Sequence, residues 1–262
     1  MAVTTFANHK GGVGKTDEVE GTAAELAIRG RRVLAVDLDP QGNLSRRMGY
    51  QEHELAERPT IAEAIRDQSE RTLRASLLPC QWEQDWAANI TLVPSRIELE
   101  ERISEAGVPL SWQRLAACLT PLIGEYDDIL IDTPPTIGHL LHLALVASDS
   151  VVGVTTPTYD AVRGIYRLKA FIENEKQRAG LGLRCRLIGV VVNMKRTNVV
   201  THEERTDALI NRFGDLVWQP ALPLRAAVED AGERAEPPQN AGKEVRDIFV
   251  ARVDSYLKAT AA

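Results

Sequence analysis

The sequence predicts an α/β fold: a doubly wound, mostly parallel sheet flanked by helices. Short apolar runs rich in β-branched residues alternate with helical patterns along the chain, as in folds that place helices on both faces of a parallel sheet. The run at residues 33–36 is apolar throughout, which is typical of a strand buried on both faces. A glycine-rich loop joins the first apolar run to an alanine-rich helical pattern, so the chain begins with a strand, a loop and a helix.

Most of the chain is assigned to strands or helices by its pattern. Predicted strands cover residues 2–7, 33–36, 90–94, 129–131, 151–155, 187–192 and 217–223. Predicted helices cover residues 19–28, 60–78, 111–123, 140–147, 161–177 and 241–258. We expect a single domain over residues 1–262, because neither a linker nor an internal repeat divides the sequence.

The composition is that of an ordinary globular protein, with 44% hydrophobic and 26% charged residues over 262 positions. No stretch of the sequence approaches the roughly 18 apolar residues that a membrane span requires, so we expect a cytoplasmic protein without a membrane partner. Cys80, Cys118 and Cys185 lie far apart, which predicts reduced, mostly buried thiols and no zinc or redox pair. With a net charge of −6, the chain would need a local basic patch to bind a nucleic acid.

Residues 8–16, N-H-K-G-G-V-G-K-T, form a predicted phosphate-binding loop of the P-loop NTPase kind. In such a loop, glycines let backbone N–H groups converge on a polyphosphate, a lysine reaches its oxygens, and a threonine hydroxyl contacts Mg²⁺. A glycine-rich turn that merely carries lysines is the alternative, but the order of strand, loop and helix favours the phosphate loop. The expected nucleotide contacts are Gly11, Gly12, Val13, Gly14, Lys15, Thr16 and Asp17.

Two carboxylate motifs follow apolar runs and fit the magnesium and water-positioning tasks of phosphoryl transfer. Asp132 stands at the Walker B position, where it would bind Mg²⁺ together with Thr16; its alternative role is that of an N-capping aspartate. Asp37 and Asp39 follow another predicted strand, at the end that faces the ligand crevice of such a sheet. Taken alone, this D-x-D pair could also be solvated loop surface.

The phosphate loop has Lys10 before its glycines and His9 where the general motif has its first glycine. The run K-G-G-V-G-K-T, with D-L-D-P-Q-G-N and D-T-P-P-T-I-G further on, resembles the deviant Walker A ATPases of the ParA/MinD type. The resemblance implies that Lys10 crosses a nucleotide-sandwich dimer interface, that Asp39 orients the attacking water, and that Asp37 joins the magnesium shell. Lys10, Lys15 and Asp39 are then the catalytic residues, and D-T-P-P-T-I-G is a switch that senses the γ-phosphate. A surface lysine without function is the alternative for Lys10.

The resemblance also places the adenine of ATP near Asn193, Leu222 and Pro223, although Asn193 could equally be a turn residue. Asp17 departs from the family pattern, which has a second hydroxyl there for the α-phosphate. Its carboxylate suits the start of a helix but would repel a triphosphate, unless Mg²⁺, Lys15 or a rotated side chain relieves the repulsion. Asp17 is therefore the reason to expect weakened affinity or slow hydrolysis.

A basic stretch occupies the second half of the chain. Between residues 163 and 212 there are eleven Lys or Arg and five Asp or Glu residues, in a chain of net charge −6. Such a stretch suits sequence-independent contacts to DNA phosphates, and a solvated helix face is the alternative. The resemblance implies nonspecific DNA binding by an ATP-bound dimer. The candidate DNA contacts are Lys195, Arg196, Arg205, Arg212 and Arg225.

The resemblance thus implies a slow, Mg²⁺-dependent DNA-partition ATPase that forms a homodimer on binding ATP. The ATP-bound dimer would associate with the nucleoid, and it would be released when a centromere-binding ParB-like adaptor stimulates hydrolysis. Because the loop begins at residue 10, we expect no N-terminal helix-turn-helix domain. The alternatives are a nucleotide-dependent dimeric scaffold with little turnover, and a ParA-like ATPase that positions a cargo other than DNA. A MinD-type membrane cycler would need a basic, amphipathic C-terminus, and an iron-protein relative would need paired cysteines near the switches; the sequence has neither.

Overall fold

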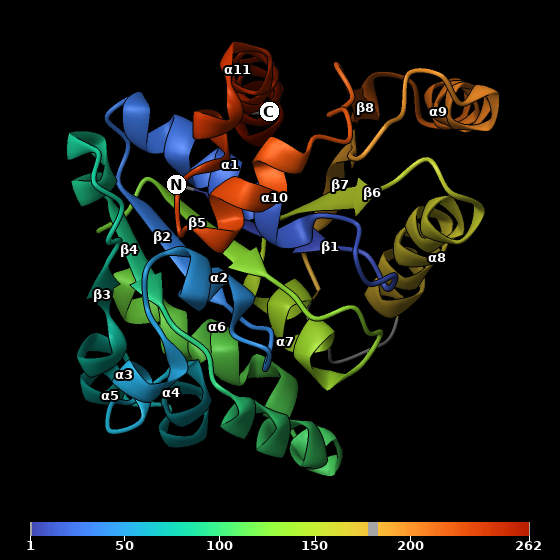
Figure 1. Ribbon diagram of the computed structural model, residues 1–262. Coiled ribbons are helices and arrows are strands. Elements are labelled where there is room, and N and C mark those ends of the chain that lie inside the picture. Colours follow the sequence, from blue (N-terminus) through green and yellow to red (C-terminus); the bar gives the residue numbers. More distant parts are fainter. Residues whose placement is uncertain (1, 178–182, 262) are drawn as a thin grey trace.

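The computed structural model describes residues 2–177 and 183–261, and it shows a mostly parallel sheet with helices on both faces (Figure 1). In the described residues, eight strands lie in the order β3-β4-β2-β5-β1-β6-β7-β8, and the edge strand β3 pairs antiparallel to β4. The strands are β1 (Ala2–Ala7), β2 (Val33–Asp37), β3 (Leu78–Pro79), β4 (Ile90–Val93), β5 (Asp128–Asp132), β6 (Ser150–Thr155), β7 (Arg186–Val192) and β8 (Val217–Trp218). The predicted fold class is confirmed.

The helices agree in part with the predicted ones. The α-helices are α1 (Lys15–Ile28), α2 (Asn43–Arg47), α3 (Glu52–Leu55), α4 (Ile61–Asp67), α5 (Glu70–Ser76), α6 (Arg114–Leu119), α7 (His139–Ala147), α8 (Tyr159–Lys176), α9 (Val200–Phe213), α10 (Ala226–Glu233) and α11 (Lys243–Ala261). The 3-10 helices are η1 (Asp85–Asn89), η2 (Ile97–Gly107), η3 (Ser111–Gln113), η4 (Thr120–Leu122), η5 (Gly214–Leu216) and η6 (Pro238–Ala241).

Three of the predicted elements are wrong in part. The helix over residues 60–78 is broken because Gln68 adopts a left-handed conformation, with φ 48°, between α4 and α5. The helix over residues 111–123 is α-helical in α6 and continues as short 3-10 turns on either side. The strand over residues 217–223 ends after β8, because Pro220 has no N–H to donate to a neighbouring strand. The sequence reasoning also missed β3, α2, α3, α9 and α10.

Helices cover both faces of the sheet because the residues of each strand alternate between two cores. Val33 and Ala35 of β2 join a core that includes apolar residues of α1 and α11. Leu34 and Val36 join a second core, which includes residues of α4, α6 and α7. Since neighbouring side chains of a strand point to opposite faces, α1 and α11 lie on one face of the sheet and α4, α6 and α7 on the other.

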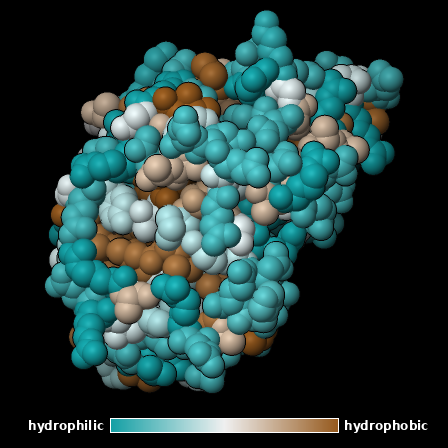
Figure 2. Space-filling view, turned by 60° about the vertical axis from the view of Figure 1, so that its left-hand side comes forward, coloured by the Kyte–Doolittle hydropathy of each residue, from teal (hydrophilic) through white to brown (hydrophobic). Residues whose placement is uncertain are grey.

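The surface is largely polar, and the apolar side chains are mostly buried. Figure 2 shows a mainly hydrophilic face with a band of hydrophobic residues across it. Within residues 2–177 and 183–261, no helix has both the length and the apolar character needed to cross a membrane. Cys80, Cys118 and Cys185 are free and buried, as predicted, and burial raises the pKa of each thiol to about 12.

The parallel strands bring three predicted site residues, together with Asn8 of the predicted phosphate loop, to one edge of the sheet. β5 pairs in parallel with both β1 and β2, and β6 pairs in parallel with β1 and β7. Asp37 and Asp132 are the last residues of their strands and are direct register partners, while Asn8 and Asn193 follow β1 and β7. Ligand crevices of doubly wound sheets form at this carboxyl edge.

We predict that Gly21→Ala lowers the free energy of unfolding by about 1–3 kcal/mol, because overpacking a core costs this much. A Cβ atom on Gly21 of α1 would lie 2.1 Å from the Phe249 ring of α11, and this clash outweighs the roughly 1 kcal/mol that alanine gains over glycine in a helix. Urea unfolding measures the effect. Gly107→Ala is the control, because a Cβ there meets no atom within 4 Å; equal stability of the two variants would contradict the packing described here.

Candidate functional site

The predicted phosphate loop connects β1 to α1 and is held at its start by Asn8. The Asn8 side-chain amide donates hydrogen bonds to the backbone carbonyls of Val154 at 2.7 Å and Ala161 at 3.1 Å. Its Oδ1 accepts a hydrogen bond from the backbone N–H of Lys10 at 3.0 Å. Gly12 and Gly14 have left-handed φ values of 68° and 81°, which glycine adopts without steric cost. The loop therefore turns sharply into the N-terminus of α1, where helix N–H groups favour an anion.

The loop meets the Walker B carboxylate directly. The Thr16 hydroxyl donates a hydrogen bond of 2.7 Å to Oδ2 of Asp132. The other oxygen, Oδ1, is buried and has no hydrogen-bond partner among the described residues. Burial raises the pKa of Asp132 to about 6, although Lys15 and the Thr16 hydrogen bond act in the opposite direction.

Asp37 lies beside Asp132 and is fully buried. Its Oδ2 accepts hydrogen bonds from the backbone N–H of Ser45 at 2.8 Å and from the Ser45 hydroxyl at 2.7 Å. Burial and the neighbouring Asp132 raise the pKa of Asp37 to about 8. Asp39 is half-buried, and its carboxylate accepts the backbone N–H of Gln41 at 3.0 Å.

The residues around Asp132 fit a hard divalent cation. Carboxylate and hydroxyl oxygens are the ligands that Mg²⁺ prefers, and Mg²⁺ is usually held by one or two side chains together with substrate phosphates and water. The buried, unpaired Oδ1 of Asp132 next to the Thr16 hydroxyl matches this donor set. A cage of three or more His, Cys, Asp or Glu side chains is absent from the part of the chain that the structure describes.

A pocket of about 620 Å³ opens above the loop. Its walls come from the phosphate loop, the segment from Asp39 to α2, the end of β7, and α10. The predicted residues that line it are Gly12, Val13, Gly14, Lys15, Thr16, Asp17, Asp39, Asn193, Leu222, Pro223 and Arg225. Lys10 and Gly11 are exposed outside this pocket, and Asp37 and Asp132 lie buried beneath it.

Asn193 lines the pocket, and its amide is already engaged. Its Nδ2 donates to the backbone carbonyls of Gly14 at 3.2 Å and Val13 at 3.4 Å, and its Oδ1 accepts from Arg252 at 2.9 Å. A Cβ on Gly14 would lie 2.8 Å from this Nδ2, so glycine is required for the close approach. In this structure Asn193 ties the end of β7 to the phosphate loop.

Two arginines that the sequence reasoning missed neutralise the carboxylates of the first turns of α1. Arg47 of α2 forms ion pairs with Asp17 and, at 3.0 Å, with Glu20. Arg252 of α11 forms a fully buried ion pair with Glu18. Three carboxylates at four consecutive positions of a predicted helix would need cationic partners if they are buried, but which arginines supply the charge depends on how the helices pack.

The candidate DNA contacts are partly brought together. A hollow of about 350 Å³ beside the pocket is lined in part by Lys195, Arg196 and Arg225, and Arg225 forms an ion pair of 2.5 Å with Glu244. Arg205 and Arg212 lie on α9 and do not line this hollow. Residues 178–182, which belong to the basic stretch, lie outside the described residues.

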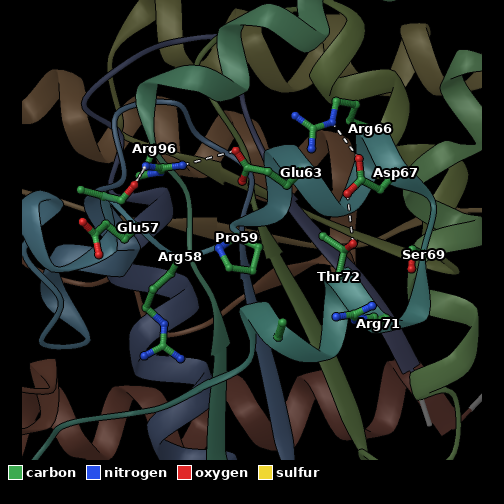
Figure 3. A pocket seen from close by; sticks show the side chains of 12 residues that line it. Glu57, Arg58, Pro59, Glu63, Arg66, Asp67, Ser69, Arg71, Thr72 and Arg96 are labelled. Carbon is green, nitrogen blue, oxygen red and sulfur yellow. Dashed lines mark hydrogen bonds and ion pairs between the residues drawn. The ribbon is translucent and has the colours of Figure 1, made fainter.

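A second hollow, of about 630 Å³, lies between α4 and α5 (Figure 3). Figure 3 shows two of its arginines paired with neighbouring carboxylates: Arg66 with Asp67 at 2.7 Å, and Arg96 with Glu63 at 3.3 Å. None of the sequence-predicted site residues lines it. The predicted chemistry therefore does not involve this hollow.

Comparison with known proteins agrees with this geometry. Residues 1–184 match a family model described as an AAA domain. The chain is 33% identical over 227 residues to the chromosome-partitioning ATPase Soj of Thermus thermophilus, and the aligned region covers 86% of this chain and 82% of Soj. The chain belongs to the ParA/MinD family of ATPases. It is also 30% identical over 237 residues to the chromosome partitioning protein ParA of Myxococcus xanthus, covering 90% of this chain and 80% of that protein.

Solved structures share the ParA-like fold. The cobyrinic acid a,c-diamide synthase of Mycobacterium smegmatis, solved with an ATP analogue and magnesium, has a TM-score of 0.77 and 25% identity, over 98% of this chain and 96% of that one. An ATP complex of a Cyanothece McdA variant has a TM-score of 0.85 at 19% identity, over 98% and 96% of the two chains. The predicted membership of the ParA/MinD family is confirmed.

We predict that Asp37→Asn increasingly stabilises this ParA-family chain as the pH rises. The folded-state pKa of Asp37 is about 8, against a reference value of 3.8. At a pH between these two values, the folded state therefore retains a proton that the unfolded state has lost. Stability of the wild type falls with rising pH over this window, and asparagine removes that loss. The difference between variant and wild type should grow by up to about 4 kcal/mol from pH 4.5 to pH 8.

Urea unfolding in EDTA at several pH values measures this difference. Asp127→Asn is the matched control: the hydrogen bond from Arg32 holds the pKa of the Asp127 carboxyl below its usual value, so both states are ionised above pH 4.5 and the difference should stay constant over this range. An Asp37→Asn difference that is independent of pH would show that Asp37 is ionised in the folded state.

Proposed function

We propose that this chain is a Mg²⁺-dependent DNA-partition ATPase that forms a homodimer on ATP. The observation that carries the proposal is the hydrogen bond between the Thr16 hydroxyl and Asp132 at the N-terminus of α1, below a pocket large enough for a nucleotide. Family membership supports ATP as the substrate, since the synthase with 25% identity was solved with an ATP analogue and magnesium.

Each residue of the pocket has a task in this proposal. Lys15 and the N-terminus of α1 bind the phosphates, and Thr16 and Asp132 hold Mg²⁺, which neutralises charge that develops on the transferred phosphoryl group. Asp39, half-buried on the pocket wall, orients the attacking water. Asp37 holds the turn through Ser45, and Mg²⁺ bound beside it would favour the ionised form of its carboxyl. Asn193 and Pro223 lie on the wall assigned to the adenine.

Lys10 is the residue assigned to the partner subunit. It is exposed outside its own pocket, and its backbone N–H is held by Asn8. A lysine fixed in this way is available to phosphates bound by a second copy of the chain, which would make dimerisation depend on ATP.

The partners in this proposal are nonspecific DNA and a centromere-binding ParB-like adaptor. The hollow beside the pocket is lined in part by three cationic side chains, Lys195, Arg196 and Arg225. Sequence-independent contacts to DNA phosphates need such a group of cations. The relatives named above are chromosome-partitioning proteins. The proposed setting is cytoplasmic, with association to the nucleoid in the ATP-bound form, and residues 1–262 are proposed to act as one ATPase domain.

We predict measurable ATP turnover in Mg²⁺ that falls by at least about tenfold in Asp39→Ala, because positioning of the attacking group contributes more than this to phosphoryl transfer. Phosphate release with and without DNA measures the rates. Asp247→Ala, an exposed carboxylate on α11, is the control and should retain wild-type turnover. Equal rates for wild type and Asp39→Ala would instead favour a nucleotide-dependent scaffold.

We predict that the wild type shifts random-sequence DNA in gels with ATP, and not with ADP or without nucleotide. Lys15→Ala should lose nucleotide binding altogether. Lys10→Ala should bind ADP within about threefold of wild type, because screening limits the reach of an exposed charge, yet lose the ATP-dependent dimer and the DNA shift. Lys258→Ala, exposed on α11, is the control. Wild-type protein that binds ATP but not DNA would point to another cargo.

A further inference from the structure

Arg47 and Asp17 form a charge pair on the wall of the nucleotide pocket. Asp17 follows Thr16 in the first turn of α1, and Arg47 is the last residue of α2, 30 positions further along the chain. Both side chains line the pocket, and they are 17% and 13% exposed for Arg47 and Asp17. The same guanidinium nitrogen also lies 3.0 Å from the fully buried Glu20.

The position of Arg47 is set by two parts of the chain besides α1: the segment that carries Trp82, and helix α10. The Trp82 indole N–H donates to the backbone carbonyl of Arg47 at 2.9 Å. A Cβ on Gly232 of α10 would lie 2.7 Å from the guanidinium carbon, so α10 packs directly against the Arg47 head group. The adjacent Arg46 forms an exposed ion pair of 3.3 Å with Glu233 of α10. The guanidinium is thus held between α1 and α10, at the wall of the pocket.

The electrostatics of this wall decide what it can bind. An uncompensated carboxylate directly after Thr16 would repel a polyphosphate at close range, and the repulsion would be strong because the site is partly shielded from water. Arg47 places a unit positive charge against that carboxylate. The charge of Asp17 is thus offset locally on the pocket wall, and α2 supplies the compensation.

We propose that Arg47 is a positioning residue for nucleotide affinity, which makes the phosphate loop competent for a nucleoside polyphosphate by neutralising Asp17. The inference rests on the proposed nucleotide function and adds a specific determinant to it. The pocket accepts a carboxylate at position 17 because α2 carries an arginine that reaches it. Affinity for the nucleotide then depends on residues of α1 and α2 jointly.

The test is a double-mutant cycle read as the Kd of a fluorescent ADP with Mg²⁺, in the absence of DNA. ADP avoids both hydrolysis and the ATP-dependent dimer. Arg47→Gln should weaken binding by about tenfold or more, since it leaves the Asp17 charge uncompensated beside the phosphates. Asp17→Asn alone should strengthen binding several-fold, because it removes a negative charge beside the phosphates while the positive charge of Arg47 stays on the pocket wall. The double variant should bind within about threefold of wild type.

Arg46→Gln is the matched control. It removes the same unit charge from the same helix, but its partner is the exposed Glu233, so its loss should be smaller and Asp17→Asn should not rescue it. Circular dichroism and thermal unfolding without nucleotide establish that each variant is folded. If Arg47→Gln does not fold, Arg47→Lys and Asp17→Asn carry the test: the first keeps the charge and should bind within about threefold of wild type, and the second should bind more tightly than wild type.

The outcomes separate this inference from the proposed function. Wild-type protein that binds no nucleotide would overturn the proposed function. Wild-type binding that Arg47→Gln leaves unchanged, or a loss that Asp17→Asn does not restore, would overturn the role of Arg47 and leave the proposed function standing. Asp17→Asn that binds no more tightly than wild type would do the same.

Discussion

Charge buried at the start of α1 is the constraint on which the rest of the site depends. Glu18 and Glu20 are each about 1% exposed, and Asp17 is buried at the pocket wall. An isolated carboxylate in such surroundings is very costly, and ion pairs inside a protein are maintained only where both partners and their hydrogen bonds are in place. Arg47 and Arg252 meet these carboxylates from α2 and α11. The two helices are therefore bound to the phosphate loop by charge as well as by apolar packing.

This arrangement also connects the ends of the chain to the site. Arg252 reaches across to Glu18, to Oδ1 of Asn193 and to the backbone carbonyl of Val192. Asn193 in turn donates to the carbonyls of the phosphate loop. The C-terminal helix thus supports the loop through one intervening side chain, and the apolar contact of Phe249 with Gly21 fixes the same helix against α1.

The fold class could be predicted because it depends on local pattern. Parallel strands buried on both faces leave apolar runs, and the carboxyl edge follows from strand order, so Asp37, Asp39 and Asp132 could be assigned to one crevice before any coordinates. The elements predicted wrongly are those governed by a single backbone conformation or by proline. Gln68 breaks a helix by adopting a left-handed conformation, which a glutamine does not predict. Pro220 limits β8 to two residues.

The sequence by itself determined the phosphate loop, its carboxylates and the membership of the ParA/MinD family, because these residues are contiguous or follow predicted strands. It raised the question of Asp17 without answering it, since the partner of a charge depends on which helices pack together. Only the tertiary structure decided that Arg47 faces Asp17, that Arg252 faces Glu18, and that Asn193 is engaged with the loop. These pairs join residues 30 to 234 positions apart, and such distances are closed by packing, which no local pattern encodes.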